Sequence, residues 1–465
     1  MSRETLIDLL YLFSATTFVL ALKGLGSPKR ARLGNMVAAF GMLVAIVATF
    51  FRHVDGHALY HVPLMILGIV IGLVVAVPVA RFVKMTAMPQ LVAIFNGVGG
   101  GAAALVSITE FMHIKASHPA TYVALEVLLG VLIGTFSFAG SAISFAKLQE
   151  LMTGRPITYP GQQVINGVVG LASLVTIGWV LVSASQAMLW VLLGLAALLG
   201  VLFVLPIGGA DVPVLISLLN AFTGVAVAAS GFTLGSNLLI VAGTLVGASG
   251  LLLTRLMSKA MGRSLANILF SAFGATVTAS GATERADGRS VRSGSPEDIA
   301  IMLGFASRVV FIPGYGLAVS QGQHVLRELA DLLESKGIEV FYGIHPVAGR
   351  MPGHMNVLLA EANVPYEQLV EMDEANSELQ TADVALVVGA NDTVNPAAVD
   401  DKTSPIYGMP IIHADLAENV VFLKRSMRPG FAGIENELLY NAKTTLVFGD
   451  AKDTLTKMVA AVKAS

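Results

Sequence analysis

The sequence contains no cysteine and few charged residues. The absence of cysteine excludes disulfide bonds, thiolate nucleophiles, and metal or cluster sites built on cysteine. Charged residues make up 13% of the 465 residues, whereas soluble proteins contain about 25%. The formal net charge is only −2, which leaves no basic footprint for nucleic acid. A single soluble domain is therefore excluded, and we predict neither a metal site nor a nucleic-acid partner.

The charges are unevenly distributed along the chain. Residues 1–257 contain 12 Lys or Arg and 7 Asp or Glu, and residues 258–465 contain the other 17 and 24. The first part is as poor in charge as a lipid-embedded protein, while the second has the composition of a soluble enzyme domain. We predict a transmembrane domain at 1–257, a Ser/Gly-rich and charged linker at 258–294, and a cytoplasmic domain at 295–465.

Nine segments of the first part are long and apolar enough to cross a bilayer, which takes about 20 residues. They are 5–22, 34–51, 62–83, 89–110, 121–145, 164–184, 186–207, 212–231 and 236–257. The first lacks the cleavage pattern of a removed signal peptide. The sixth and seventh segments nearly fuse, as do the last two, so each pair should form a tight hairpin. Glycine and alanine are dense in the fourth span, which permits close contact between helices.

Lysine and arginine in the short loops predict the orientation, because cytoplasmic loops carry an excess of both. The loop after the first span and the other loops on its side contain 11 of these residues, whereas the loops on the opposite side contain 3. We expect the N-terminus outside and the charged C-terminal domain in the cytoplasm. The lipid bilayer would be the inner (plasma) membrane of the cell.

Few polar side chains fall at membrane depth, where each costs free energy unless it meets a partner or water. Asn96 and Asn220 lie inside the fourth and eighth predicted spans. Asp211 and Arg263 flank span ends on the predicted cytoplasmic side. A role in translocation and simple hydrogen bonding between helices are both consistent with these residues, and the residue types leave the two open.

After residue 295, short apolar strands alternate with helices. The predicted strands are 308–312, 338–344, 383–388, 410–413, 419–423 and 445–448, and the predicted helices are 317–334, 354–362, 366–379 and 450–463. A helix before the first of these strands is expected to start at Pro296, with Ser295 as its N-cap residue. The alternation is typical of a doubly wound parallel sheet. The expected fold is a nine-span α-helical membrane domain followed by an α/β Rossmann-like domain, whose ligands bind at the carboxyl ends of the strands.

The first strand-to-helix turn has the pattern G-x-G-x-x-V, formed by Gly314, Tyr315, Gly316 and Val319. Glycines at such a turn let the backbone approach a pyrophosphate at the start of a helix. The third glycine of the usual fingerprint is missing, so the pattern indicates a dinucleotide with moderate specificity.

Two features favour NADP(H) over NAD(H). The second strand ends at His345 without the carboxylate that an NAD site usually carries there, and Arg350 follows. The strand 419–423 runs directly into Lys424, Arg425 and Ser426. Two cations and a hydroxyl at a strand end suit the 2′-phosphate of NADP. A solvated basic turn is the alternative.

A further loop at a strand end, 389–395, is rich in groups that can bond a nicotinamide carboxamide or a ribose. Asp392 is its only ionisable residue, and a carboxylate beside the nicotinamide could sense proton occupancy. An Asx turn that serves only the backbone is the alternative interpretation.

Long blocks of the sequence resemble one known family. The blocks are 313–319, 343–362, 389–398 and 424–427 in the C-terminal part, with 88–93, 208–213 and 219–220 in the membrane part. They are similar to the beta subunit of proton-translocating NAD(P) transhydrogenase, and the resemblance covers nearly the whole chain.

This resemblance implies a two-subunit membrane enzyme, with hydride passing from NADH to NADP as protons enter the cytoplasm. NADP(H) would bind to this chain, and NAD(H) to an alpha subunit made of one or two chains. The complex would be a dimer of heteromers, and this chain would be active only with its partner. Some members of the family carry a histidine where this chain has Asn96. Amides do not titrate near neutrality, so we expect Asn96 and Asn220 to orient water while an ionisable group elsewhere carries the proton.

With the resemblance, the predicted NADP(H)-binding residues form six groups along the chain. They are Gly314, Tyr315, Gly316 and Val319; His345, Val347, Ala348, Gly349, Arg350, Met351, Pro352 and Gly353; Gly389, Ala390, Asn391, Asp392, Thr393, Val394 and Asn395; Gly408 and Met409; Lys424, Arg425, Ser426, Gly430, Phe431 and Ala432; and Asp450 and Ala451. Residues 430–433 would form a lid over the nucleotide. The predicted catalytic and proton-path residues are Asp392, Asn96, Asn220, Asp211 and Arg263.

A rival class is a nine-span secondary transporter or channel that a cytoplasmic nucleotide-binding domain regulates. Such transporters usually show internal repeats with broken helices in matching halves. The sequence has no such repeat. Its basic turn suits a 2′-phosphate, which a sensor of NAD or ATP would not require.

Overall fold

The computed structural model describes residues 3–54, 57–58, 61–114, 121–153, 156–208, 211–261, 265, 291–351, 353–402, 404, 406–430 and 432–464. The chain divides into two compact units, Met1–Thr254 and Arg255–Ser465. Most of the predicted linker, 258–294, lies outside the described residues, although its last part contributes a short strand to the second unit.

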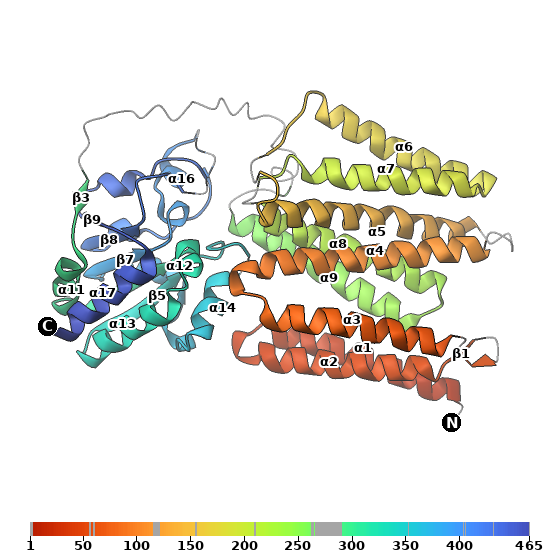
Figure 1. Ribbon diagram of the computed structural model, residues 1–465, viewed down its shortest axis with the longest axis horizontal. Coiled ribbons are helices and arrows are strands. Elements are labelled where there is room, and N and C mark those ends of the chain that lie inside the picture. The colour runs from red at the N-terminus through yellow and green to blue at the C-terminus, as the bar shows by residue number, and fades with distance from the viewer. Residues whose placement is uncertain are drawn as a thin grey trace. The chain divides into compact units, whose positions relative to one another are not determined.

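The described residues up to Ala260 contain nine helices that are long and apolar enough to cross a membrane, which confirms the nine predicted spans. They are α1 (Arg3–Leu25), α2 (Pro28–Phe50), α3 (Val62–Phe82), α4 (Met88–Ile114), α5 (Thr121–Leu148), α6 (Gln162–Ser183), α7 (Gln186–Val204), α8 (Val212–Thr233) and α9 (Asn237–Ala260). A two-stranded ribbon, β1 (His53–Val54) and β2 (His57–Ala58), joins α2 to α3. Only Ala184 and Ser185 separate α6 from α7, so this pair forms the expected tight hairpin (Figure 1).

Helix α5 is central to the first unit and packs against α4, α7 and α8. Small residues permit α5 to approach α4 closely. A Cβ atom on Gly134 of α5 would lie 2.7 Å from the carbonyl oxygen of Gly100 and 2.9 Å from the backbone nitrogen of Ala104, both on α4. No larger residue fits at this position, so the backbones of α4 and α5 are in direct contact, as small residues in the fourth span predict.

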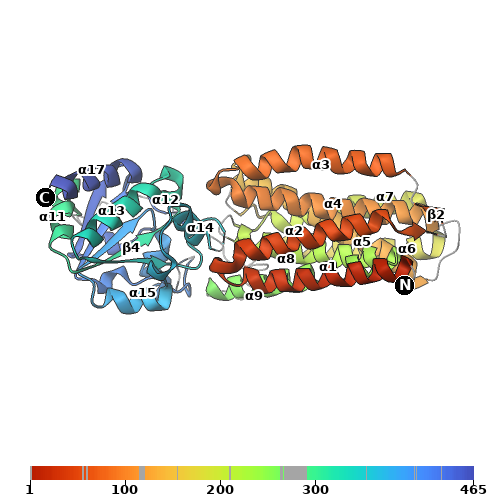
Figure 2. The same cartoon turned by 90° about the horizontal axis from the view of Figure 1, so that it is seen from below.

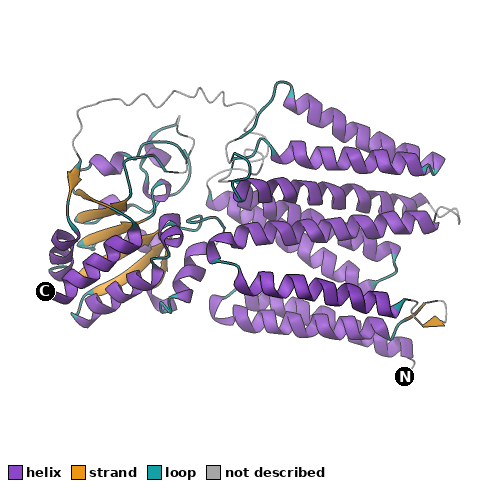
Figure 3. Ribbon diagram, viewed as in Figure 1, coloured by secondary structure: helices purple, strands orange, loops and turns teal. Residues whose placement is uncertain are grey.

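The second unit is built on a parallel sheet of seven strands in the order β3-β9-β8-β7-β4-β5-β6. The strands are β3 (Arg292–Ser293), β4 (Arg308–Pro313), β5 (Glu339–Ile344), β6 (Leu369–Glu371), β7 (Val384–Val388), β8 (Asn419–Lys424) and β9 (Thr444–Phe448). Every pairing in this sheet is parallel. The predicted Rossmann-like doubly wound sheet is therefore confirmed, and Figure 3 shows its strands in orange between the helices.

Helices cover both faces of this sheet. They are α11 (Pro296–Gly304), α12 (Tyr315–Ser320), α13 (Gln323–Ser335), α14 (His354–Glu361), α15 (Met372–Leu379), α16 (Ala397–Asp400) and α17 (Ala451–Ala464), with short 3₁₀ turns η4 (Tyr366–Gln368), η5 (Asp392–Val394), η6 (Ala414–Leu416) and η7 (Glu437–Tyr440). Helices α13 and α17 lie on one face and α15 on the other (Figure 2). Ser295 forms the predicted cap of α11, because its hydroxyl accepts from the backbone of Asp298 while the Asp298 carboxylate accepts from the backbone of Ser295.

Three predicted elements differ from the structure. The helix expected at 317–334 is divided into α12 and α13, since Gln321 adopts a left-handed φ of 53°. The helix expected at 366–379 is replaced in its first half by a 3₁₀ turn and a short edge strand, β6, which pairs with β5. The strand expected at 410–413 is wrong. Its backbone bonds to a side chain and to a loop instead, because Asn376 donates to the Ile411 carbonyl and accepts from the His413 amide, and the Ile412 amide donates to the Thr393 carbonyl.

Candidate functional site

The strand order reverses between β4 and β7. From this pair, the chain proceeds to β5 and β6 on one side and to β8 and β9 on the other. Ligands of open α/β sheets bind outside the carboxyl ends of the strands at such a reversal. The loops that follow β4 and β7 are those that contain the predicted Gly314 turn and the predicted Asp392 loop.

These two loops are in direct backbone contact. The backbone nitrogen of Gly314 donates to the carbonyl of Val388 at 2.9 Å, and that of Gly316 donates to the carbonyl of Gly389 at 2.9 Å. A Cβ atom on Gly314 would lie 2.5 Å from the carbonyl oxygen of Gly389. Both glycines are therefore required by the approach of the loops to each other. In dinucleotide sites, glycines at such a turn also let the backbone approach the pyrophosphate. Here the Cβ positions of both glycines face the backbone of the Asp392 loop.

The predicted phosphate turn and the Asp392 loop are joined by side chains. Lys424 Nζ donates to Asn391 Oδ1 at 2.9 Å, and Asn391 Nδ2 donates to Asp392 Oδ1 at 3.0 Å. The backbone nitrogen of Ala432 donates to Asp392 Oδ2 at 2.8 Å. Burial lowers the pKa of Lys424, and the nearby charge of Asp392 opposes this effect. Residues from two separate predicted groups thus form one hydrogen-bonded chain.

The segment that contains the predicted lid is held to the Asp392 loop at further points. Asn395 Nδ2 donates to the carbonyl of Glu435 at 2.9 Å, and Asn436 Nδ2 donates to the carbonyl of Asn391 at 3.0 Å. A Cβ atom on Gly430 would collide with the Asp392 carboxylate. Asn436 was not predicted, because an asparagine in an irregular segment carries no pattern of its own. Phe431 lies outside the described residues.

Arg425 and Ser426 follow Lys424 as exposed residues at the carboxyl end of β8. The neighbouring strand β9 ends beside them, since the backbone nitrogen of Gly449 donates to the carbonyl of Lys424 at 3.0 Å. This pairing brings Asp450 and Ala451, at the start of α17, close to the turn.

The side chains of four further predicted residues differ in burial. Ala390 and Val394 belong to the hydrophobic core of the second unit, so only their backbone could contact a ligand. The Thr393 hydroxyl oxygen is buried and has no hydrogen-bond partner within the described part of the chain. Val319 is 46% exposed on α12.

His345 lies buried at the carboxyl end of β5 and makes two hydrogen bonds. Its Nε2 lies 2.7 Å from the carbonyl oxygen of Pro410, and its Nδ1 accepts from the backbone nitrogen of Val347 at 3.2 Å. The carbonyl can only accept, so Nε2 carries the proton. Burial lowers the pKa of His345 to about 4. The neutral imidazole therefore fixes the β5–α14 loop to the segment after Gly408 and Met409, and within the described residues neither of its hydrogen bonds reaches the Asp392 loop.

The β5–α14 loop contains the remaining predicted contacts. Val347, Ala348, Gly349, Arg350, Met351 and Gly353 all belong to it, while Pro352 lies outside the described residues. The loop reaches the Gly314 turn through one side chain, because the guanidinium carbon of Arg350 lies 4.4 Å from the centre of the Tyr315 ring. That distance is typical of a cation–π contact.

In the membrane unit, Asn96 belongs to a buried polar cluster between α4, α5 and α8. Asn96 Nδ2 donates to Ser141 Oγ at 2.8 Å and reaches Ser137 Oγ at 3.4 Å. Ser137 Oγ in turn donates to the carbonyl of Leu219 at 2.9 Å and bonds to Thr223 Oγ1 at 2.6 Å. Asn96 Oδ1 is buried without a partner among the described residues. The serines were not predicted, although their spacing of four residues on α5 places both on one helix face.

The other predicted membrane residues are placed differently. Asn220 is half-buried on α8, and no hydrogen bond joins it to another side chain of the described residues. Asp211 is the N-cap residue of α8 and is 9% exposed. Arg263 lies outside the described residues.

A buried lysine lies at the C-terminal end of α7. Lys147, in the last turn of α5, is 3% exposed and donates from Nζ to the carbonyls of Val204, Leu205 and Ile207 at 3.1, 2.6 and 2.7 Å. The carbonyls of Val204 and Leu205, at the end of α7, are among those that a helix C-terminus leaves without intrahelical partners. In the prediction of orientation, Lys147 is one of the basic residues assigned to the cytoplasmic loops. Its structural role depends on the packing of α5 against α7, which the sequence does not show.

A model of the NAD(P) transhydrogenase beta subunit family matches residues 7–461. A curated NAD(P) transhydrogenase subunit beta of Rhodospirillum rubrum is 47% identical over 461 residues, which cover 97% of this chain and 98% of the relative. A second curated protein of that name, from a particular strain of the same species, matches with the same figures.

The chain belongs to the NAD(P) transhydrogenase beta subunit family. Together with the nine apolar helices, this membership indicates a multi-pass membrane protein. The family also implies that pyridine nucleotide is involved and that an alpha subunit is the partner of the chain.

Proposed function

We propose that the second unit binds NADP(H) at the reversal between β4 and β7, and that the chain couples hydride transfer between NADH and NADP to proton movement. The main observation behind this proposal is the chain from Lys424 through Asn391 to Asp392, which joins a cationic turn to a carboxylate beside the glycine turn. A basic turn exposed only to solvent would need no such link.

The residues at this edge suit a phosphorylated dinucleotide. An ammonium group has three N–H donors, and Lys424 uses two of them, on Asn391 and on the carbonyl of Arg428 at 3.3 Å. Within the described part of the chain, one donor thus remains for a phosphate oxygen. The guanidinium of Arg425 and the hydroxyl of Ser426 would complete a site for the 2′-phosphate. The glycine turn at Gly314 and Gly316 would hold the pyrophosphate.

The nicotinamide ring, when bound, supplies the carbon that accepts or gives the hydride. This chain would orient the ring by means of the loop from Gly389 to Asn395. Asp392 would hold the lid, because its Oδ2 is the acceptor for the backbone nitrogen of Ala432. A neutral Asp392 is a weaker acceptor, so a change in its charge would release the lid and change the affinity for the nucleotide.

The chain has one dinucleotide fingerprint, so the second nucleotide must come from elsewhere. We assign NAD(H) to the alpha subunit, whether this is one chain or two, and we expect the complex to be a dimer of heteromers. The chain alone should have no transhydrogenase activity.

The proton path would pass through the membrane unit, where Asn96, Ser137 and Thr223 already form a polar chain from α4 to α8. Asn220 would extend it, and Asp211 and Arg263 would lie at its cytoplasmic end. The amides would orient water there. The distribution of basic residues supports an N-terminus outside and the second unit in the cytoplasm, in the inner (plasma) membrane.

The experiment that tests this function is calorimetric titration of the purified full chain in detergent with NADP⁺, NADPH, NAD⁺ and NADH. We expect measurable binding of the two phosphorylated nucleotides and much weaker binding of the other two. Addition of the alpha subunit should then produce hydride transfer from NADH. Equal affinity for all four nucleotides, or a preference for NAD(H), would instead favour a transporter with a regulatory nucleotide domain.

A further inference from the structure

His354 is fully buried at the first position of α14, and within the described residues its imidazole makes one hydrogen bond. Its Nδ1 accepts from the backbone nitrogen of Arg350 at 3.0 Å. The proton of the neutral ring is therefore on Nε2, which is buried and has no partner within the described part of the chain. A buried donor without a partner is unfavourable. A leucine at this position would avoid this cost. The feature that the imidazole offers and a leucine lacks is the hydrogen-bond acceptor at Nδ1.

The turn that contains Arg350 packs directly against this imidazole. Gly349 has a φ of +109°, and a Cβ atom there would lie 2.6 Å from both Cβ and Nδ1 of His354. Only glycine allows the turn to come so close. The position of the Arg350 backbone is thus set by His354 on one side and by the left-handed turn on the other.

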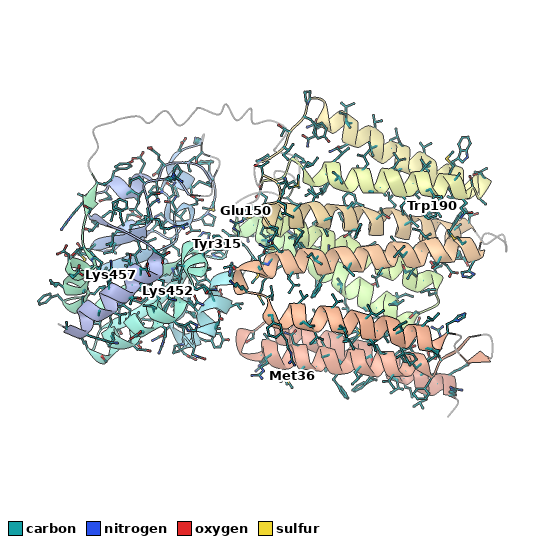
Figure 4. The ribbon with its side chains drawn as sticks, viewed as in Figure 1. Met36, Glu150, Trp190, Tyr315, Lys452 and Lys457 are labelled. Carbon is teal, nitrogen blue, oxygen red and sulfur yellow. The ribbon has the colours of Figure 1, made fainter. Side chains whose placement is uncertain are left out.

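The side chain of Arg350 extends from this turn to the ring of Tyr315, 4.4 Å from its centre. The same ring meets the imidazole of His354 edge-on, with 6.1 Å between the ring centres. Tyr315 lies between Gly314 and Gly316 at the strand reversal, where it is labelled in Figure 4. His354 therefore contacts both partners of the cation–π pair, one through a backbone hydrogen bond and the other through its ring.

We propose that His354 is a positioning residue that holds Arg350 against Tyr315, so that the guanidinium is presented to a phosphate oxygen of the dinucleotide beside the glycine turn. This inference rests on the proposed NADP(H) site and adds a residue that does not itself touch the nucleotide. Burial lowers the pKa of His354, and the charge of Arg350 lowers it further. The imidazole is accordingly neutral near pH 7, and Nδ1 remains available as the acceptor.

Two amide substitutions separate this role from simple packing. In His354→Asn the side-chain oxygen lies at about the position of Nδ1 and can still accept from Arg350. In His354→Gln it reaches one bond farther, so the acceptor is misplaced although the group is the same. We expect His354→Gln to weaken NADP⁺ binding by the full chain about tenfold, and His354→Asn to stay within about threefold of the unchanged protein.

The double variant His354→Gln/Arg350→Ala gives the second readout. If His354 acts through Arg350, the double variant should bind NADP⁺ no more weakly than Arg350→Ala alone, because residues that act through one another are not additive. His324→Gln, at an exposed histidine on α13, is the matched control and should bind normally. All variants are titrated as full chains in detergent at one ionic strength.

The outcomes also distinguish this inference from the function on which it rests. If the unchanged chain does not prefer NADP⁺ to NAD⁺, the proposed site itself is wrong. If it does, and Arg350→Ala weakens binding while His354→Gln and His354→Asn weaken it equally or not at all, the positioning role is overturned. Additive losses in the double variant would overturn it as well.

Discussion

Asp392 is in contact with its neighbours through both carboxylate oxygens. Oδ1 accepts from the amide of Asn391, and Oδ2 accepts from the backbone nitrogen of Ala432. In Asp392→Asn one of these acceptors becomes a donor that faces another donor. We expect NADP(H) affinity to change by about tenfold, which corresponds to about 1.4 kcal/mol, and hydride transfer to lose its dependence on the proton gradient. Titration in detergent and rates in energised vesicles measure the two effects, and no change in either would refute this role.

Arg425 should determine the preference for the phosphorylated nucleotide. A hydrogen bond to a charged group contributes about 1.5–3 kcal/mol, so Arg425→Ala should weaken NADP(H) binding by roughly one to two decades. Binding of NAD(H), which lacks the 2′-phosphate, should hardly change. Arg425→Lys should restore only part of the loss, because an ammonium cannot form the planar paired contact.

Arg428→Ala is the matched control for this prediction, since Arg428 is an exposed arginine three residues farther along the same segment. Calorimetric titration of both nucleotides at fixed ionic strength is the measurement. If Arg425→Ala weakens both nucleotides equally, the turn is a solvated surface, and Arg350 becomes the first candidate for the phosphate site.

The buried His345 should make the second unit sensitive to acid. Its pKa is lowered to about 4 in the folded chain, below the ordinary value of about 6.5. The unfolded chain then binds more protons between pH 6.5 and 4, so stability is complete above this window and is lost as the pH falls through it. At pH 5 the loss from this residue is about 2 kcal/mol.

Melting temperatures at pH 7.5 and pH 5.0 test this expectation. The decrease between the two should be smaller for His345→Gln than for the control His324→Gln, which removes an exposed imidazole. Equal decreases would show that His345 does not govern the acid response.

At the scale of elements, α4, α5 and α8 meet through polar side chains that bury their hydroxyl and amide groups together. Ser137 of α5 is the junction, because it is bonded to Thr223 and to the Leu219 carbonyl of α8 and lies within reach of Asn96 of α4. Helices α4 and α5 are also in direct backbone contact at Gly100 and Gly134. Close packing and a polar chain therefore occur together, so any proton path here must be narrow and lined by few groups.

Asn220→Leu tests whether this region conducts protons. We expect the substitution to abolish proton pumping by the reconstituted complex and to leave NADP⁺ binding unchanged, because the nucleotide would bind to a different unit of the chain. Asn237→Leu, at the exposed start of α9, is the control and should pump normally. Pumping that survives in Asn220→Leu would mean that the residue serves only the packing of α8.

At the scale of the whole molecule, the absence of cysteine makes the orientation directly measurable. A single introduced cysteine is a unique reporter in this chain. Ser185→Cys lies in the α6–α7 hairpin and should react with a membrane-impermeant maleimide from outside intact cells. Ser27→Cys, between α1 and α2, should react only in inverted vesicles. The opposite result would reverse the predicted topology and place the second unit outside.

The sequence alone determined the elements that depend on local composition. The nine spans follow from long apolar segments, and the alternation of strands and helices after residue 295 follows from short periodic patterns. The glycines around Tyr315 were also predictable, since a turn between a buried strand and a helix needs them. These features could be predicted because each depends on residues that are neighbours in the chain.

Tertiary structure decided the features that depend on a distant partner. The segment 410–413 resembles a strand in composition, yet His345 and Asn376 bond to its backbone in place of a neighbouring strand. Lys147 is one basic residue among many in the sequence, and His354 is one histidine among nine. Lys147 has a structural role because it donates to carbonyls at the end of α7. His354 has one because it accepts from the backbone nitrogen of Arg350. A hydrogen bond forms only where folding places its two atoms about 3 Å apart, and that distance is set by packing between segments far apart in the chain.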